Sequence, residues 1–246
     1  MSSYGSRSAA SHATPLDLTP RPRIDSLLPP AYFGPMVSFL RRPLRYSYYN
    51  ATLILIVVNV LVFLFSYVDR QGRIMYLALI PDYVLHEGWW WQIVTYMFVH
   101  SGWAHIFFNM LALFLFGIQL ERRMGSTEFL FFYFFTGIGA GLATVLINAS
   151  SGMGMIPVVG ASGAIFGLLL GFASFFPDAR LFIFGILPLR APVAVLLYAG
   201  IEIFLQLTNF QSGVAHLTHL AGIAFAYLYI VVRFGINPIS VFFRRQ

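Results

Sequence analysis

Long apolar runs dominate the chain and determine its predicted elements. Six runs contain no Lys, Arg or Asp, and each approaches the roughly 20 residues with which a helix spans about 30 Å of hydrocarbon. They cover residues 51–67, 104–120, 129–147, 161–176, 192–207 and 214–232. The runs are continuous and lack the two-residue alternation of a barrel strand, so they predict helices. The sequence therefore predicts an all-α membrane protein with a six-transmembrane-helix bundle.

Composition supports lipid as the main solvent. The chain is 59% hydrophobic and only 10% charged, with a mean hydropathy of +0.77, and a water-soluble domain carries much more polar surface. It contains no cysteine, which excludes disulfides and cysteine-based metal or redox chemistry.

The basic residues are all arginine, and most fall on one side of the predicted bundle. A net charge of +6 taken alone could suggest nucleic acid, but the distribution argues against that partner. Only Arg70 and Arg73 lie on the other side. The rest are Arg7, Arg21, Arg23, Arg41, Arg42, Arg45, Arg122, Arg123, Arg180, Arg190, Arg233, Arg244 and Arg245. By the positive-inside rule both termini are expected in the cytoplasm.

Three regions are predicted. Residues 1–47 are rich in Ser, Pro and Arg and predict a disordered, basic cytoplasmic tail without a secretory cleavage pattern. Residues 48–233 form the six-helix core, and residues 234–246 a short basic tail. The loop over 68–103 holds three adjacent tryptophans, expected at the membrane interface. The compact core without a targeting peptide favours a multi-pass protein of a prokaryotic cytoplasmic membrane.

Polar groups at membrane depth are costly and are therefore functional candidates. In this topology every even-numbered span begins at the external side. The beginnings of spans two, four and six carry His105, Ser162 and His219. We expect these three side chains in one layer just below the external surface.

A serine and a histidine in that layer fit acyl transfer. Ser162 would attack a carbonyl, and His219 would accept its proton and later protonate the leaving amine, without an obligatory third group. Candidate oxyanion donors are the Ser162 backbone N–H, the His105 imidazole and the Asn109 amide. His105 and Asn109 are also compatible with simple interhelical hydrogen bonding.

Small residues favour close packing of spans four and six. Gly163 and Gly167 lie on one face of span four, while Gly222 and Ala226 follow His219 on one face of span six. Such faces let two helix backbones approach closely. This packing would bring Ser162 within hydrogen-bond reach of His219.

With these motifs the chain resembles the rhomboid family of intramembrane serine proteases, from about residue 53 to residue 232. The matching segments are Gly160-Ala161-Ser162-Gly163, His105-Ile106-Phe107-Phe108-Asn109, His219-Leu220-Ala221-Gly222, Glu121-Arg122-Arg123-Met124-Gly125 and the tryptophan-rich first loop.

The resemblance implies a Ser162–His219 dyad, no metal or organic cofactor, and a water-filled cavity open to the external side. It implies lipid-embedded substrates: transmembrane helices cut near their external end, at a small residue, once the helix locally unwinds. Phe166 resembles the family's aromatic residue that packs against the catalytic imidazole. Gly160, Gly163 and Gly222 would support the dyad.

Three positions depart from the family pattern. Gln92 follows Trp91 where the family often has Arg, Thr218 stands where Ala usually precedes the histidine, and Ala226 replaces a usual Gly. We expect Ala226 to loosen helix packing slightly and to leave the dyad intact.

Other charged and polar residues are given structural roles. Glu202 in span five is expected to be protonated or hydrogen-bonded near Gln206. His216 either lines the cavity or is an interfacial structural histidine. Glu121 is expected to pair with Arg123 at a helix end.

Three rival functions remain. A pseudoprotease would bind client transmembrane helices without cutting them. A metalloprotease commonly needs a His-Glu-x-x-His pattern, which is absent from the sequence. A transporter or channel is suggested by Glu202 and the polar layer. The sequence ranks the serine endopeptidase first.

Overall fold

The computed structural model of the chain describes residues 39–68, 75–183, 186–207 and 214–243. All of them belong to one compact unit, Phe33–Gln246. The second unit, Met1–Tyr32, lies outside the described residues, as does most of the predicted N-terminal tail.

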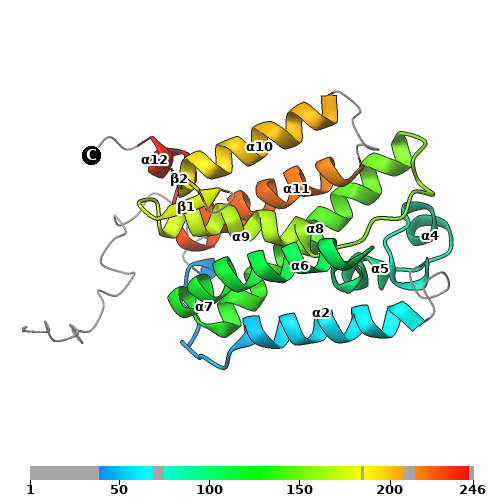
Figure 1. The fold of residues 1–246 in the computed structure, drawn as a ribbon, viewed down its shortest axis with the longest axis horizontal. Coiled ribbons are helices and arrows are strands. Elements are labelled where there is room, and N and C mark those ends of the chain that lie inside the picture. The colour runs from blue at the N-terminus through cyan, green and yellow to red at the C-terminus, as the bar shows by residue number, and fades with distance from the viewer. Residues whose placement is uncertain (1–38, 69–74, 184–185, 208–213, 244–246) are drawn as a thin grey trace, which may run out of the picture. The chain divides into compact units, whose positions relative to one another are not determined.

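The regular secondary structure of the described part is helical, apart from one hairpin and one isolated bridge (Figure 1). Its longer helical segments are α2 (Ala51–Val68), α6 (Trp103–Ala112), η3 (Leu113–Gly117), α7 (Ile118–Met124), α8 (Ser126–Ser150), α9 (Ser162–Phe175), α10 (Ala191–Leu207), α11 (Val214–Tyr229) and η4 (Ile230–Phe234). Short helices α4 (Pro81–His86), α5 (Gln92–Thr95) and η2 (Tyr96–Phe98) form the first loop, and α12 (Pro238–Phe242) follows η4.

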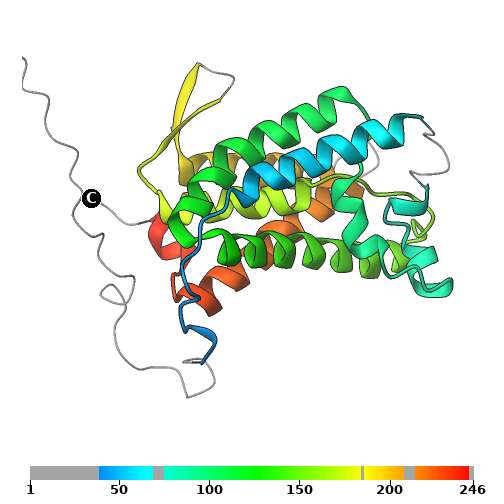
Figure 2. The same ribbon diagram turned by 90° about the horizontal axis from the view of Figure 1, so that it is seen from below.

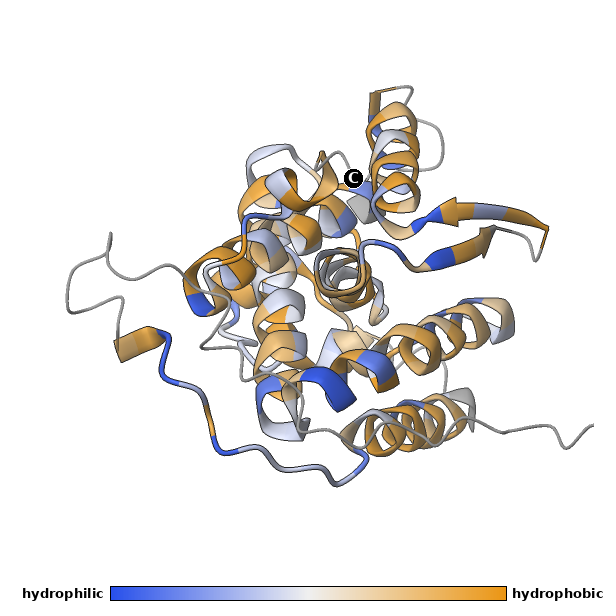
Figure 3. Ribbon diagram, turned by 90° about the vertical axis from the view of Figure 1, so that its left-hand side faces the viewer, coloured by the Kyte–Doolittle hydropathy of each residue, from blue (hydrophilic) through white to orange (hydrophobic). Residues whose placement is uncertain are grey.

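Within the described residues, three helices are long and apolar enough to cross a membrane: Trp103–Met124, Ser126–Ser150 and His216–Phe234. They coincide with predicted spans two, three and six. Spans one, four and five correspond to the shorter apolar helices α2, α9 and α10. A mostly helical, apolar fold is thus observed, while by length and composition the described residues supply three clear spans rather than six. In Figure 3 the helices are coloured hydrophobic along most of their length.

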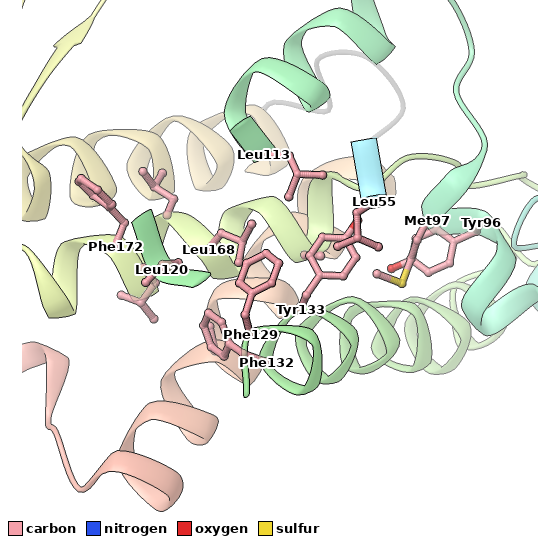
Figure 4. Packing of buried hydrophobic residues seen from close by; sticks show 14 of the residues in the cluster. Leu55, Tyr96, Met97, Leu113, Leu120, Phe129, Phe132, Tyr133, Leu168 and Phe172 are labelled. Carbon is pink, nitrogen blue, oxygen red and sulfur yellow. The ribbon is translucent and has the colours of Figure 1, made fainter. Parts of the chain in front are cut away.

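Helix α9 is the centre of the bundle. It contacts α6, α7, α8, α10 and α11, and eleven of its 14 residues are buried. A helix that is apolar on all sides is buried in a protein core or in lipid, and most of the surface of α9 is covered by neighbouring helices. Figure 4 shows part of this core, where Phe129, Phe132 and Tyr133 of α8 lie close to Leu168 of α9.

Glu121 holds the beginning of α2. Its carboxylate accepts the backbone N–H groups of Ala51 (2.6 Å) and Thr52 (2.9 Å) and the hydroxyl of Ser126 (2.5 Å). Free N–H groups and the helix dipole make a helix N-terminus a good site for an anion. The expected ion pair between Glu121 and Arg123 was wrong. The Glu121 carboxylate is fully buried and accepts the first N–H groups of α2, which have no partner within the helix.

Ion pairs and carbonyl contacts gather at the same end of the bundle. Arg233 binds Glu128, with Nη2 2.7 Å from Oε2, and also donates to the Leu40 carbonyl. Arg41 donates to the Val231 and Val232 carbonyls at the end of η4. The last residues before the predicted core therefore contact the helix ends.

A β-hairpin follows α9 and was not predicted. Strands β1 (Arg180–Ile183) and β2 (Leu187–Arg190) pair antiparallel, and the hairpin projects from the helices (Figure 2). Arg190 pairs with Asp178 at 2.6 Å. The segment is too short and too interrupted by Gly and Pro for alternation to reveal it from sequence.

The first loop is held by Gln92 and by stacked rings. Gln92 is fully buried, donates to the Met75 and Tyr76 carbonyls and accepts from Ile80 N–H (3.0 Å). Trp89 and Trp91 stack on each other, whereas Trp90 is well exposed. A neutral amide thus orders the loop at a position where the family often has Arg.

Candidate active site

Ser162 and His219 meet between α9 and α11. Ser162 is the first residue of α9, and its Oγ lies 2.7 Å from Nε2 of His219. The approach depends on small residues, since a β-carbon on Gly222 would lie 2.0 Å from the Gly163 carbonyl oxygen. Two residues separated by 57 positions thereby come within proton-transfer distance.

Phe166 fixes the plane of the His219 ring. The two rings stack with centroids 4.5 Å apart and an interplanar angle of 11°. Phe166 lies one turn after Ser162, so the same helix face carries the hydroxyl and the ring that packs on its partner.

His105 presents a donor to the same space. Its Nδ1 lies 3.4 Å from Ser101 N–H and 3.0 Å from Ser101 Oγ. A backbone N–H can only donate, so Nδ1 accepts, and the neutral ring carries its proton on Nε2. Gly160, at φ +120°, makes room for Nε2: a β-carbon there would lie 2.7 Å from it and 3.6 Å from Ser162 Oγ.

Asn109 lies one turn beyond His105. Its amide donates to the His105 carbonyl at 2.8 Å, which uses one of its two N–H groups. The other N–H is available to a ligand.

A groove of about 1100 Å³ joins these residues. It is lined by α6, η3, α7 and α9, with contributions from β1, α10 and α11, and it contains His105, Asn109, Ser162, Phe166 and His219. Beyond the polar end its walls are mainly aliphatic and aromatic. Such a groove suits an extended apolar peptide segment.

Glu202 also reaches this site, which was not predicted. Its Oε2 lies 2.5 Å from Nδ1 of His216, and its Oε1 lies 3.0 Å from Nδ1 of His219. Glu202 is hydrogen-bonded, which was one of the two expected alternatives, but its partner is His216 and not Gln206. The carboxylate is turned toward the two imidazoles of α11. His216 is a hydrogen-bond partner of Glu202 and is absent from the groove lining.

The ligand atoms of Glu202, His216 and His219 lie within 4.8 Å of one another, as they would around a metal. However, 2.5 Å is shorter than the roughly 3.3 Å that separates two donors on a tetrahedral zinc with bonds of about 2.0–2.1 Å. The arrangement is that of a hydrogen-bonded carboxylate.

Residues 87–236 match the family model of the Rhomboid domain. The chain belongs to the rhomboid family. It is an integral membrane protein, and its family is one of proteases.

Similarity to individual rhomboid proteins supports the same family assignment. The chain is 40% identical over 86 residues to rhomboid protease GluP of Bacillus subtilis, covering 35% of this chain and 16% of that protein. It is 31% identical over 133 residues to rhomboid protease AarA of Providencia stuartii, covering 48% and 47%. It is 30% identical over 167 residues to the mitochondrial Rhomboid protein 1 of Saccharomyces cerevisiae, covering 65% and 47%.

In each case the chain covers less than two thirds of the relative's own length. Because these relatives come from bacteria and from a eukaryote, the expected prokaryotic origin stays a prediction.

Proposed function

We propose that this rhomboid protein is an intramembrane serine endopeptidase that cuts transmembrane helices of other membrane proteins near their external end. The observation that carries the proposal is the 2.7 Å approach of Ser162 Oγ to His219 Nε2. Family membership supports the reaction class.

In the proposed reaction Ser162 Oγ attacks the scissile carbonyl carbon while its proton moves to His219 Nε2. The carbonyl oxygen becomes an oxyanion, for which His105 Nε2–H, an Asn109 N–H and the Ser162 backbone N–H are the donors. His219 then protonates the leaving amine. An acyl-enzyme remains, and water activated by His219 hydrolyses it.

The groove supports a membrane-embedded substrate. Its polar end holds the dyad, and its long wall is apolar, so an unwound helix segment could lie along it with a small residue at Ser162. The pairing of Arg233 with Glu128 at the opposite end of the bundle agrees with the proposed orientation, in which the arginine-rich end and both termini face the cytoplasm.

The test is cleavage of a fluorogenic transmembrane substrate by the purified full chain in lipid vesicles. We expect cleavage by the unaltered chain and loss of at least about 10³-fold in the Ser162→Ala and His219→Ala variants. Ser101→Ala is a milder comparison that should keep the dyad.

Undiminished cleavage by Ser162→Ala would rule out the proposal. If the unaltered chain binds the substrate without cutting it, the pseudoprotease is the better description.

A further inference from the structure

Ser162, His219, Glu202 and His216 form a continuous chain of polar contacts. The distances along it are 2.7 Å from Ser162 Oγ to His219 Nε2, 3.0 Å from His219 Nδ1 to Glu202 Oε1, and 2.5 Å from Glu202 Oε2 to His216 Nδ1. These residues come from α9, α10 and α11. The serine thus faces one nitrogen of the imidazole and a carboxylate faces the other.

From this geometry we infer that Glu202 is a positioning residue for His219, which makes the catalytic group a Ser162–His219–Glu202 triad. The inference rests on the proposed function. By accepting the Nδ1 proton of His219, the carboxylate would keep Nε2 unprotonated and directed at Ser162. When the serine proton moves to Nε2, the ionised Glu202 stabilises the resulting imidazolium and keeps its own charge.

An ionised carboxylate without partners is energetically costly inside a membrane. Glu202 is 8% exposed and lies within the apolar helix α10. A carboxylate in such a place is stable only with partners. Both partners of Glu202 are imidazoles of α11, and one of them is the proposed base.

His216 holds the carboxylate for His219. The 2.5 Å contact is a directed hydrogen bond, while the Glu202–His219 contact is one of ion-pair distance without hydrogen-bond alignment. Because His216 anchors Oε2, Oε1 stays within reach of His219 Nδ1.

The charged and titratable groups that face His219 are Glu202, His216 and, across the groove, His105. Glu202 supplies the negative charge of this set. Removing it should make His219 a weaker base, so the acid limb of activity should move to lower pH.

The test compares Glu202→Gln, Glu202→Asp and the control Gln206→Ala, which lies one turn along the same helix. Each full chain is placed in vesicles, and kcat and KM for the fluorogenic substrate are measured from pH 5 to 9. The rate of Ser162 labelling by a fluorophosphonate and thermal unfolding are measured in parallel.

We expect Glu202→Gln to lower kcat by about 10²–10⁴-fold with little change in KM, because an amide N–H facing Nδ1 favours the wrong tautomer. The remaining fluorophosphonate labelling of Ser162 in Glu202→Gln should lose its rate at a lower pH than in the unaltered chain. Glu202→Asp should recover part of the rate, and Gln206→Ala should stay within about twofold of the unaltered chain.

A folded Glu202→Gln protein with unaltered kcat and pH profile would overturn the inference while leaving a Ser162-dependent protease intact. Cleavage that survives the Ser162→Ala substitution would instead rule out the proposed function. Complete inactivation by a zinc chelator would also overturn the inference, because it would make the three residues a metal site.

Discussion

Gly222 of α11 lies directly against the backbone of Gly163 in α9. A β-carbon on Gly222 would come within 2.0 Å of the Gly163 carbonyl oxygen and 3.2 Å of its Cα. Backbone atoms cannot rotate away as a side chain can. The separation of the two helices that carry Ser162 and His219 is therefore set by the absence of a side chain at this contact.

Replacing Gly222 with Ala should push α11 from α9. We expect a loss of about 1–3 kcal/mol in stability and more than tenfold in proteolysis, measured by thermal unfolding and by substrate cleavage. Gly200→Ala is the matched control, since nothing lies within 4 Å of a β-carbon there. Equal behaviour of the two variants would contradict the backbone contact.

The Thr144 and Thr218 hydroxyls form a buried pair at 2.7 Å, which gives a reason for Thr at a position where Ala is usual in the family. Thr144 also bonds the Ala140 carbonyl in its own helix. A double-mutant cycle with Thr144→Val and Thr218→Val should give a coupling energy of about 0.6–1.7 kcal/mol in unfolding measurements. Strict additivity would show that the hydroxyls do not interact.

Gln92 ties the first loop to the bundle. Gln92→Leu would remove the acceptor of the buried Ile80 N–H and the donor to the Met75 carbonyl, while Trp91 Nε1 would still bind the Tyr76 carbonyl. The unsatisfied Ile80 N–H should cost about 1–3 kcal/mol. Gln92→Glu keeps the acceptor for Ile80 and loses both donors, so it should also destabilise. Unfolding temperature and protease sensitivity of the loop provide the measurements, and full stability of Gln92→Leu would refute this role.

His100 should make stability depend on pH. Burial lowers its pKa to about 4, helped by the neighbouring His105, against 6.5 in the unfolded chain. Between pH 6.5 and pH 4, His100 is protonated in the unfolded state but stays neutral in the folded state. The free energy of unfolding therefore falls as the pH drops from 6.5 to 4. The loss approaches roughly 3 kcal/mol.

Thermal unfolding at pH 4.5 and 7.5 should show a smaller difference for His100→Gln than for the unaltered chain. The exposed His86 provides the control substitution His86→Gln, which should leave the difference unchanged. If both variants behave alike, His100 is not the responsible group.

Apolar runs predicted the helices well, because continuous hydrophobic sequence leaves little choice of structure in lipid. The predicted segments at 51–67 and 214–232 agree closely with α2 and with α11 plus η4. The hairpin after α9 was missed, since its strands of four residues carry no periodic signal. Glu121 was given the wrong partner, because the residues it caps lie about 70 positions away.

Glu202 could have been predicted at the site by the same reasoning on membrane depth that placed His105, Ser162 and His219 in one layer. It lies five residues before the end of α10, and His219 lies five residues after the start of α11. At 1.5 Å per residue both are about 7.5 Å from the same end. Side-chain direction decides whether such residues meet, and an isolated sequence does not give it.

The length of α9 has a consequence for the first loop. Fourteen residues extend about 21 Å, less than the hydrocarbon thickness of about 30 Å, so a crossing at this position would have to be completed by irregular chain. Its amide groups would be stranded in lipid without partners, yet Gly160 N–H bonds the Tyr96 carbonyl, and Val158 and Leu79 exchange two bonds at 2.9 Å. The segment over residues 75–100 therefore supplies hydrogen-bond partners to the irregular chain that precedes Ser162.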